Sequence, residues 1–337
     1  MPSETDAVDP VARIEEASRQ LASAKTEIAK RIVGQEQVVD LSLITILSGG
    51  HALLVGVPGL AKTRLVETLG TVLGLDNARI QFTPDLMPAD ILGSEVLETG
   101  ADGSRAFKFI QGPIFTRLLM ADEINRASPR TQSALLQAMQ EKIVTVAGES
   151  RALGRPFHVL ATQNPIEQEG TYPLPEAQLD RFLLQIDVDY PTRDEERDIL
   201  LATTGAEEAQ AAPVFDAEGL LALQRLVREM PVGERVVEAI LTIVRAARPV
   251  GPEASPAAAE KLAFGPGPRA AQSLMLAVRA RALIEGRLAP SIEDVTALAT
   301  ATMEHRMALT FGARAEGVTI RSVVEEILAA QTLEAAA

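Results

Sequence analysis

The chain has 337 residues, of which 47% are apolar and 3% aromatic, and it contains no tryptophan and no cysteine. This length allows two domains with separate cores, and the lack of cysteine excludes disulfides, thiolate metal sites and cysteine nucleophiles. The formal net charge of -14 argues against a surface that wraps DNA or RNA.

The first part of the chain predicts a tail and two helices. Residues 1–9 are polar and acidic, and we expect them to be disordered. Apolar residues recur at helical spacing from Val11 to Ile32, and a second helix is expected from Glu36 to Ser48. The connection at Val33 and Gly34 is a candidate wall for a nucleotide base, although it is equally typical of a plain turn between helices.

No segment approaches the roughly 18 to 20 consecutive apolar residues that a bilayer span needs. We therefore expect no membrane insertion and a cytoplasmic protein.

The segment from Leu53 to Leu69 predicts a buried strand, a glycine-containing loop and a helix, which is the context of a phosphate-binding loop. Glycines would let the loop turn its N–H groups toward a polyphosphate, and the helix N-terminus would add partial positive charge. Lys62 would reach the β- and γ-phosphates, and the Thr63 hydroxyl would hold Mg²⁺. Ala61 stands where the general pattern has glycine. The residues expected to contact the nucleotide here are Gly56, Val57, Pro58, Gly59, Leu60, Ala61, Lys62, Thr63 and Arg64.

Two inserted hairpins are expected, at about residues 94–110 and 142–160. After a strand predicted over Ile80–Thr83, apolar and polar residues alternate on both sides of a turn-rich segment at Thr99–Ser104, as in a β-hairpin. In the second excursion, Lys142–Val146 and Phe157–Leu160 would be the extended segments and the residues between them a loop. Insertions of this kind tend to carry function.

Asp122 and Glu123 follow four apolar residues at the end of a predicted strand. Because ligands bind outside the carboxyl ends of parallel strands, these residues should face the same crevice as Lys62. Asp122 would hold Mg²⁺, and Glu123 would polarise the water that attacks the γ-phosphate. The alternative is that this acidic pair merely marks the exit of a strand to solvent. Asn164, at the end of a later strand, offers a neutral amide to orient a water or a phosphate oxygen.

Two arginines are further candidates. Arg181 lies between a predicted short helix and the last strand; it is either a surface cation or a group that a neighbouring subunit uses on the γ-phosphate. Arg269 would begin a helix, where a cation is disfavoured unless an anion shares the site. We place an α/β nucleotide-binding domain at residues 10–190 and a helical lid domain at 191–337, with loops at Thr204–Val214 and Pro249–Ala259.

From about Ile14 to about Leu328 the chain resembles AAA+ ATPases of the MoxR family. The resemblance is carried by Gly56–Thr63, Leu118–Glu141, Ala161–Phe182 and Gly265–Ala270. It implies a P-loop NTPase core, in which helices sandwich a parallel sheet, and a C-terminal all-α lid.

The resemblance also implies roles for individual residues. Lys62 and Thr63 would be the Walker A residues, Asp122 and Glu123 the Walker B pair, and Asn164 the sensor 1 residue. Arg181 would be an arginine finger donated across a subunit boundary, Arg269 would be the sensor 2 residue of the lid, and both hairpins would point toward a central pore.

The function implied by the resemblance is ATP hydrolysis with Mg²⁺ in a homo-hexameric ring. Such a ring would act as a chaperone-like remodeller or a metal-insertion factor, on a von Willebrand factor A-domain protein or another client. A nucleic-acid motor is one alternative, but the first hairpin offers Arg105 and Lys108 beside Glu95, Glu98 and Asp102, a balance that does not favour phosphate binding. A nucleotide-gated scaffold with little turnover is another, and the hydrolytic residues argue against it.

Overall fold

The computed structural model describes residues 9–99, 104–166, 170–204 and 209–331. The predicted tail at 1–9 and the centre of the first predicted turn therefore lie almost wholly outside the described residues. Contacts divide the chain into two compact units. The first comprises Ile28–Ser42 and Gly49–Leu221, and the second comprises Met1–Glu27, Leu43–Ser48 and Ala222–Ala337.

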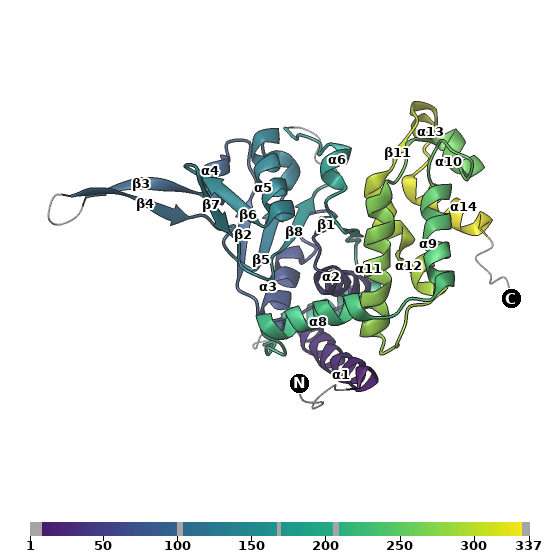
Figure 1. Ribbon diagram of the computed structural model, residues 1–337, viewed down its shortest axis with the longest axis horizontal. Helices are drawn as coiled ribbons and strands as arrows, with labels where there is room; N and C mark the ends of the chain where they lie inside the picture. Colours follow the sequence, from purple (N-terminus) through teal and green to yellow (C-terminus); the bar gives the residue numbers. More distant parts are fainter. Residues whose placement is uncertain (1–8, 100–103, 167–169, 205–208, 332–337) are drawn as a thin grey trace, which may run out of the picture. The chain divides into compact units, whose positions relative to one another are not determined.

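A five-stranded parallel sheet forms the centre of the first unit (Figure 1). The strand order is β2-β5-β8-β1-β9, so β2 and β9 are the edges. The inner strands consist almost entirely of buried residues, as expected for a parallel sheet covered on both faces. The strands are β1 (Ala52–Val55), β2 (Asn77–Gln81), β5 (Leu118–Asp122), β8 (His158–Gln163) and β9 (Leu184–Asp187). The second strand thus begins and ends earlier than the predicted Ile80–Thr83.

Helices flank this sheet, and α5 (Pro129–Glu141) shows how the sequence places them. Ser128 accepts a hydrogen bond from the Thr131 N–H and so caps the helix, while Pro129 occupies the first turn. Leu135, Leu136 and Met139, predicted to face inward, belong to one buried cluster with residues of β1, β5 and β8. The other helices that lie wholly in this unit are α3 (Lys62–Val72), α4 (Pro88–Leu92), η1 (Ile124–Arg126), α6 (Glu176–Leu179) and α7 (Arg193–Thr203).

Both predicted hairpins are present, one of them with different strands. β3 (Gly93–Thr99) and β4 (Arg105–Gln111) pair antiparallel over seven positions and project from the sheet (Figure 1). In the second excursion β6 (Ile143–Val146) pairs with β7 (Glu149–Ala152) and not with the predicted extended segment Phe157–Leu160, most of which instead enters the central sheet as part of β8. Ala147 and Gly148 both have positive φ, so they form a two-residue turn that reverses the chain earlier than predicted.

The second unit is mainly helical. Its buried side chains come from several helices, among them Val227, Ile240, Leu274 and Leu298. A two-stranded ladder, β10 (Leu262–Phe264) with β11 (Ala308–Leu309), was not predicted, and neither was the helix within the segment expected as a loop at Pro249–Ala259. The helices are α1 (Pro10–Ala29), α2 (Glu36–Leu47), α8 (Ala217–Glu229), α9 (Glu234–Ala246), α10 (Pro256–Lys261), α11 (Pro268–Ile284), α12 (Ile292–Met303), η2 (Glu304–Arg306), α13 (Phe311–Ala315) and α14 (Ile320–Ala330); α1, α2 and α8 contribute residues to both units. Among the described residues, no helix has the length and apolar character that crossing a membrane requires.

Candidate active site

The loop between β1 and α3 has the backbone of a phosphate-binding loop. Gly59 and Ala61 have φ values of 87° and 54°, so both lie in the left-handed region. An alanine pays about 1 to 2 kcal/mol for this conformation, which glycine would adopt freely. The sequence predicts that Gly56 lets the backbone turn toward the phosphates. The structure gives another reason for glycine at this position, because a Cβ atom there would lie 2.4 Å from the carbonyl oxygen of Val188. The loop therefore packs closely against the segment after β9.

Lys62 begins α3 and is held inside the loop. Its ammonium group donates hydrogen bonds to the carbonyl oxygens of Gly56, at 2.5 Å, and Val57, at 3.2 Å. Burial lowers the pKa of Lys62, while the nearby carboxylates of Asp122 and Glu123 act in the opposite direction. The result is a half-buried cation at a helix N-terminus, which is suited to binding an anion.

The two acidic residues at the end of β5 are held by different partners. Asp122 receives the Thr162 hydroxyl at 2.5 Å and a guanidinium hydrogen bond from Arg79 at 2.5 Å. Glu123, with a φ of 56°, receives the Gln81 amide at 2.8 Å and the Arg126 guanidinium at 2.7 Å. Both carboxylates are thus fixed by hydrogen bonds from side chains.

A single cavity of about 430 Å³ brings the two halves of the predicted site together. Asn164 also lines it; this residue is buried, and its side-chain oxygen accepts the Ile166 N–H at 3.1 Å. The lining residues are Pro58, Gly59, Ala61, Lys62, Thr63, Arg64, Arg79, Gln81, Asp122, Glu123, Thr162 and Asn164. The carboxyl ends of β5 and β8 and the start of α3 therefore face one space, as predicted.

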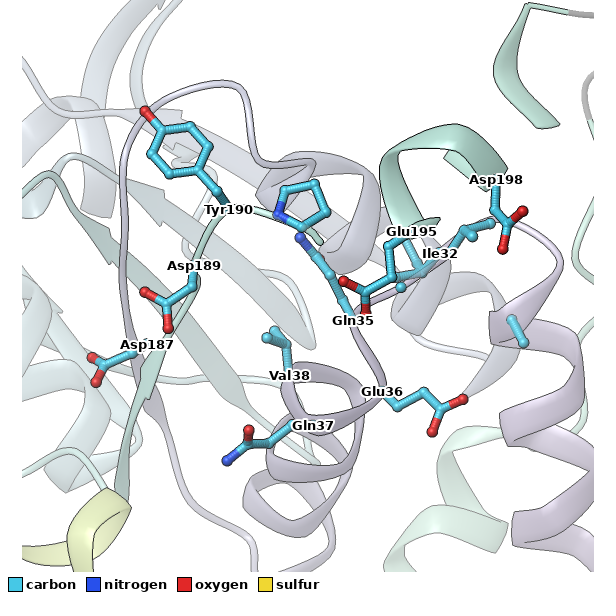
Figure 2. A pocket seen from close by; sticks show the side chains of 14 residues that line it. Ile32, Gln35, Glu36, Gln37, Val38, Asp187, Asp189, Tyr190, Glu195 and Asp198 are labelled. Carbon is cyan, nitrogen blue, oxygen red and sulfur yellow. The ribbon is translucent and has the colours of Figure 1, made fainter. Parts of the chain in front are cut away.

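Val33 and Gly34 line a second cavity, of about 550 Å³. Figure 2 shows Asp187, Asp189 and Tyr190 along its wall, with Glu195 across from them. A Cβ atom at Gly34 would lie 2.6 Å from the Cβ atom of Glu195, so only glycine fits here. A hydrogen bond joins the second cavity to the phosphate-binding loop, because Gln35, which lines this cavity, donates its amide to the carbonyl oxygen of Leu60.

The two candidate arginines belong to different units. Arg181 follows α6, and its guanidinium donates to the carbonyl oxygen of Leu136 at 2.5 Å. The described residues that line the cavity around Lys62 do not include Arg181. Arg269 is exposed, is the second residue of α11 and belongs to the second unit. Within the first unit, the structure therefore gathers Lys62, Thr63, Asp122, Glu123 and Asn164 around the first cavity, but not Arg181.

Sequence reasoning missed four residues that hold the carboxylates: Arg79, Gln81, Arg126 and Thr162. Arg79 and Gln81 lie on the same side of β2, and β2 pairs with β5 in parallel, with Gln81 opposite Asp122. The alternation of β2 could have indicated them, but only if the pairing of these two strands had been known.

The cavity fits Mg²⁺ and the phosphates of ATP. The Thr63 hydroxyl and the Asp122 carboxylate are hard oxygen donors, which Mg²⁺ prefers, and this ion is commonly held by one or two carboxylates together with substrate phosphates. In the part of the chain that the structure describes, no cluster of three or more His, Cys, Asp or Glu side chains could hold a metal alone. A metal bound here would accordingly take further oxygen ligands from water or from the nucleotide.

The fold and the cavity are those of a P-loop nucleotide-binding protein of the AAA class. Comparison with known proteins leads to the same class. Residues 51–184 match the model of the ATPase family associated with various cellular activities, and residues 254–327 match the AAA lid domain. A crystal structure of a protein from Cytophaga hutchinsonii superimposes with a TM-score of 0.88 at 36% identity, over 95% of this chain and 97% of that one.

Curated relatives narrow the class to one family. Chaperone MoxR1 of Mycobacterium tuberculosis is 41% identical over 308 residues, which cover 91% of this chain and 81% of that protein. Protein MoxR of Methylorubrum extorquens is 32% identical, over 86% of this chain and 87% of its own length. YeaC of Bacillus subtilis, an uncharacterized protein, is 40% identical, over 92% of this chain and 93% of its own length. The chain belongs to the MoxR family of AAA+ ATPases.

Proposed function

We propose that this protein is an ATP-hydrolysing motor that remodels a protein client. The observation that supports hydrolysis most strongly is the cavity in which Lys62 and Thr63 face Asp122, Glu123 and Asn164. A protein that only binds nucleotide has no need for a second carboxylate and an amide at this position.

Each residue has a distinct role in the proposed reaction. Lys62 would bind the phosphates, and Thr63 and Asp122 would hold Mg²⁺, which would neutralise charge on the phosphate oxygens. Glu123 orients the attacking water and accepts its proton, and Asn164 fixes a water or a phosphate oxygen by hydrogen bonding. The second cavity, with Val33 and Gly34, would take the base.

We further propose that the sites are completed at subunit boundaries of a homo-hexameric ring. Arg181 would then serve the nucleotide of a neighbouring subunit, which accords with its position away from the cavity around Lys62. Arg269 would bind phosphate from the lid. These assignments follow the predicted roles of the two arginines.

Remodelling of a protein client is supported by the printed name of the M. tuberculosis relative, a chaperone, and by the projecting hairpin of β3 and β4. The mixed charge of this hairpin, where Lys108 pairs with Glu98 at 3.2 Å, suits a polypeptide better than nucleic acid. Maturation of a metalloprotein, with a von Willebrand factor A-domain protein as partner, is a narrower form of the same proposal.

The test of hydrolysis is a pair of variants assayed for both ATP binding and phosphate release. Glu123→Gln should keep ATP affinity within about threefold and lose at least about 100-fold in turnover, because an amide cannot accept the proton of the water. Lys62→Ala should instead weaken ATP binding. Unchanged turnover in Glu123→Gln would remove this carboxylate from the mechanism, and stimulation of turnover by DNA or RNA would favour a nucleic-acid motor.

A further inference from the structure

The proposed magnesium ligand is already paired with an arginine. Arg79, on edge strand β2, directs both Nε, at 3.1 Å, and Nη2, at 2.5 Å, to Oδ2 of Asp122. The Asp122 side chain is 13% exposed and the Arg79 side chain 50% exposed, so the pair lies at the rim of the cavity with the carboxylate inside.

Both oxygens of Asp122 are engaged in this arrangement. Oδ1 accepts the Thr162 hydroxyl at 2.5 Å, and Oδ2 accepts the two N–H groups of Arg79. Nη2 of Arg79 also donates to Gln81 at 2.9 Å, and Gln81 in turn donates to Glu123. The guanidinium is therefore oriented by a neighbour and is not a loosely placed surface charge.

We propose that Arg79 is a positioning residue that holds Asp122 before the metal binds and competes with Mg²⁺ for this carboxylate. The proposal rests on the proposed function, since it concerns the same site. An arginine cannot lose its proton, so its charge opposes a second cation beside Asp122 unless the side chain moves away. Because half of the Arg79 side chain is exposed, it can move into solvent at small cost. The free energy needed to separate Arg79 from Asp122 then raises the Mg²⁺ concentration at which the site is half occupied.

The experiment measures how Mg²⁺ supports nucleotide binding, without hydrolysis. A fluorescent β,γ-imido analogue of ATP is bound to the full-length protein, and Mg²⁺ is titrated to find the half-saturating concentration. Arg79→Gln should lower this concentration by roughly three- to tenfold, because one ion pair no longer competes. Arg79→Lys keeps the charge but not the two parallel donors, and it should lie between the wild type and Arg79→Gln.

Arg117→Gln is the matched control. Arg117 pairs with Asp76 at 2.9 Å and is 41% exposed, and this pair lies at the opposite ends of the same two strands. Its removal should leave the Mg²⁺ titration unchanged. Arg79→Lys keeps the proposal testable if Arg79→Gln does not fold.

Three outcomes separate the possibilities. A half-saturating concentration that is unchanged or higher in the Arg79 variants would overturn the proposal, and a higher value would mean that Arg79 assists Mg²⁺ binding and does not compete with the ion. A wild-type protein that binds the analogue neither with nor without Mg²⁺ would overturn the proposed function itself. A lower half-saturating Mg²⁺ concentration in both Arg79 variants, but not in Arg117→Gln, would support competition between Arg79 and Mg²⁺ for Asp122.

Discussion

Thr162 organises both acidic residues at the end of β5. Its hydroxyl donates to Asp122 and accepts the backbone N–H of Glu123 at 2.9 Å, and the residue is 1% exposed. One buried hydroxyl thus holds the side chain of Asp122, the proposed metal ligand, and the backbone of Glu123, the residue proposed to orient the water. A buried polar group that loses its partner costs about 1 to 3 kcal/mol.

Thr162→Val should therefore reduce both stability and turnover. The change keeps the shape but leaves the Glu123 N–H without its acceptor, so we expect the free energy of unfolding to fall by about 1 to 3 kcal/mol and the kcat for ATP to fall at least about tenfold. Chemical denaturation and phosphate release would measure the two effects. Thr162→Ser, which retains the hydroxyl, is the control; equal losses in the two variants would contradict the role given to the hydrogen bonds.

His51, which precedes β1, and His158, the first residue of β8, form a buried pair with ring centroids 6.5 Å apart. Nδ1 of His51 accepts the Val159 N–H at 2.9 Å, so that ring is held in a neutral form. Burial lowers the pKa of His51 to about 3 and that of His158 to about 4. Neither histidine is among the residues that line the cavity around Lys62.

These histidines should make the first unit sensitive to mild acid. Below the unfolded pKa of about 6.5, the unfolded chain takes up protons that the native chain does not, so the free energy of unfolding decreases as the pH is lowered. Above this pH both states are neutral at these histidines, and their contribution no longer changes with pH. Between pH 6.5 and 5, each histidine should lower the free energy of unfolding by about 1.6 kcal/mol. Urea unfolding at pH 7.5, 6.5 and 5.0 would show this slope, and His158→Asn should reduce it by about half. Equal stability at pH 6.5 and 5.0 would contradict the neutral pair.

At the scale of elements, the two hairpins are joined by one aromatic contact. The guanidinium of Arg151, on β7, lies 4.0 Å from the ring centroid of Phe109, on β4, and Phe109 also packs edge to face on Phe115. Phe107, on the same face of β4, is 72% exposed. The base of the projecting hairpin is thus anchored while its outer part is open.

Arg151→Gln should loosen the β3–β4 hairpin without unfolding the sheet. A cation–π contact of this kind contributes about 0.5 to 1 kcal/mol at exposed sites, so amide exchange in β4 should accelerate severalfold. Hydrogen exchange followed by mass spectrometry would measure it, and exchange in β8 should remain as in the wild type. Arg151→Lys should preserve part of the protection. Exchange in β4 that does not change would show that the anchor lies elsewhere.

Local patterns in the sequence predicted the central elements well. The strand, loop and helix around Lys62, the apolar strand ending at Asp122 and the inward face of α5 each depend on residues close in sequence, so periodicity and motif spacing suffice. The family resemblance is confirmed by the relatives and the family models. The individual site roles stay predictions, although the structure places five of those residues around one cavity.

What the sequence could not supply depends on tertiary contacts. The early turn at Ala147 and Gly148 requires positive φ at an alanine, which residue preferences do not predict. Arg79, Gln81 and Thr162 are recognised only when the order of strands places β2 and β8 on either side of β5. The place of Gly56 is set by the carbonyl group of Val188, more than 130 residues later in the sequence.

For the molecule as a whole, the central claim is that ATP is hydrolysed at a site shared by two copies of the chain. Arg181 is bound to the Leu136 carbonyl group of its own chain and, among the described residues, does not line the cavity around Lys62. If it acts on the nucleotide of a neighbour, a chain that lacks Arg181 and a chain that lacks Glu123 can repair each other at some boundaries.

The most direct measurement is the ATPase activity of mixtures of Arg181→Ala and Glu123→Gln proteins. Each variant alone should be almost inactive. Mixing should restore phosphate release, with a maximum near equal amounts, because some boundaries then carry an intact arginine beside an intact glutamate. Assemblies shown by mass to contain both variants, yet no more active than either alone, would contradict the shared site.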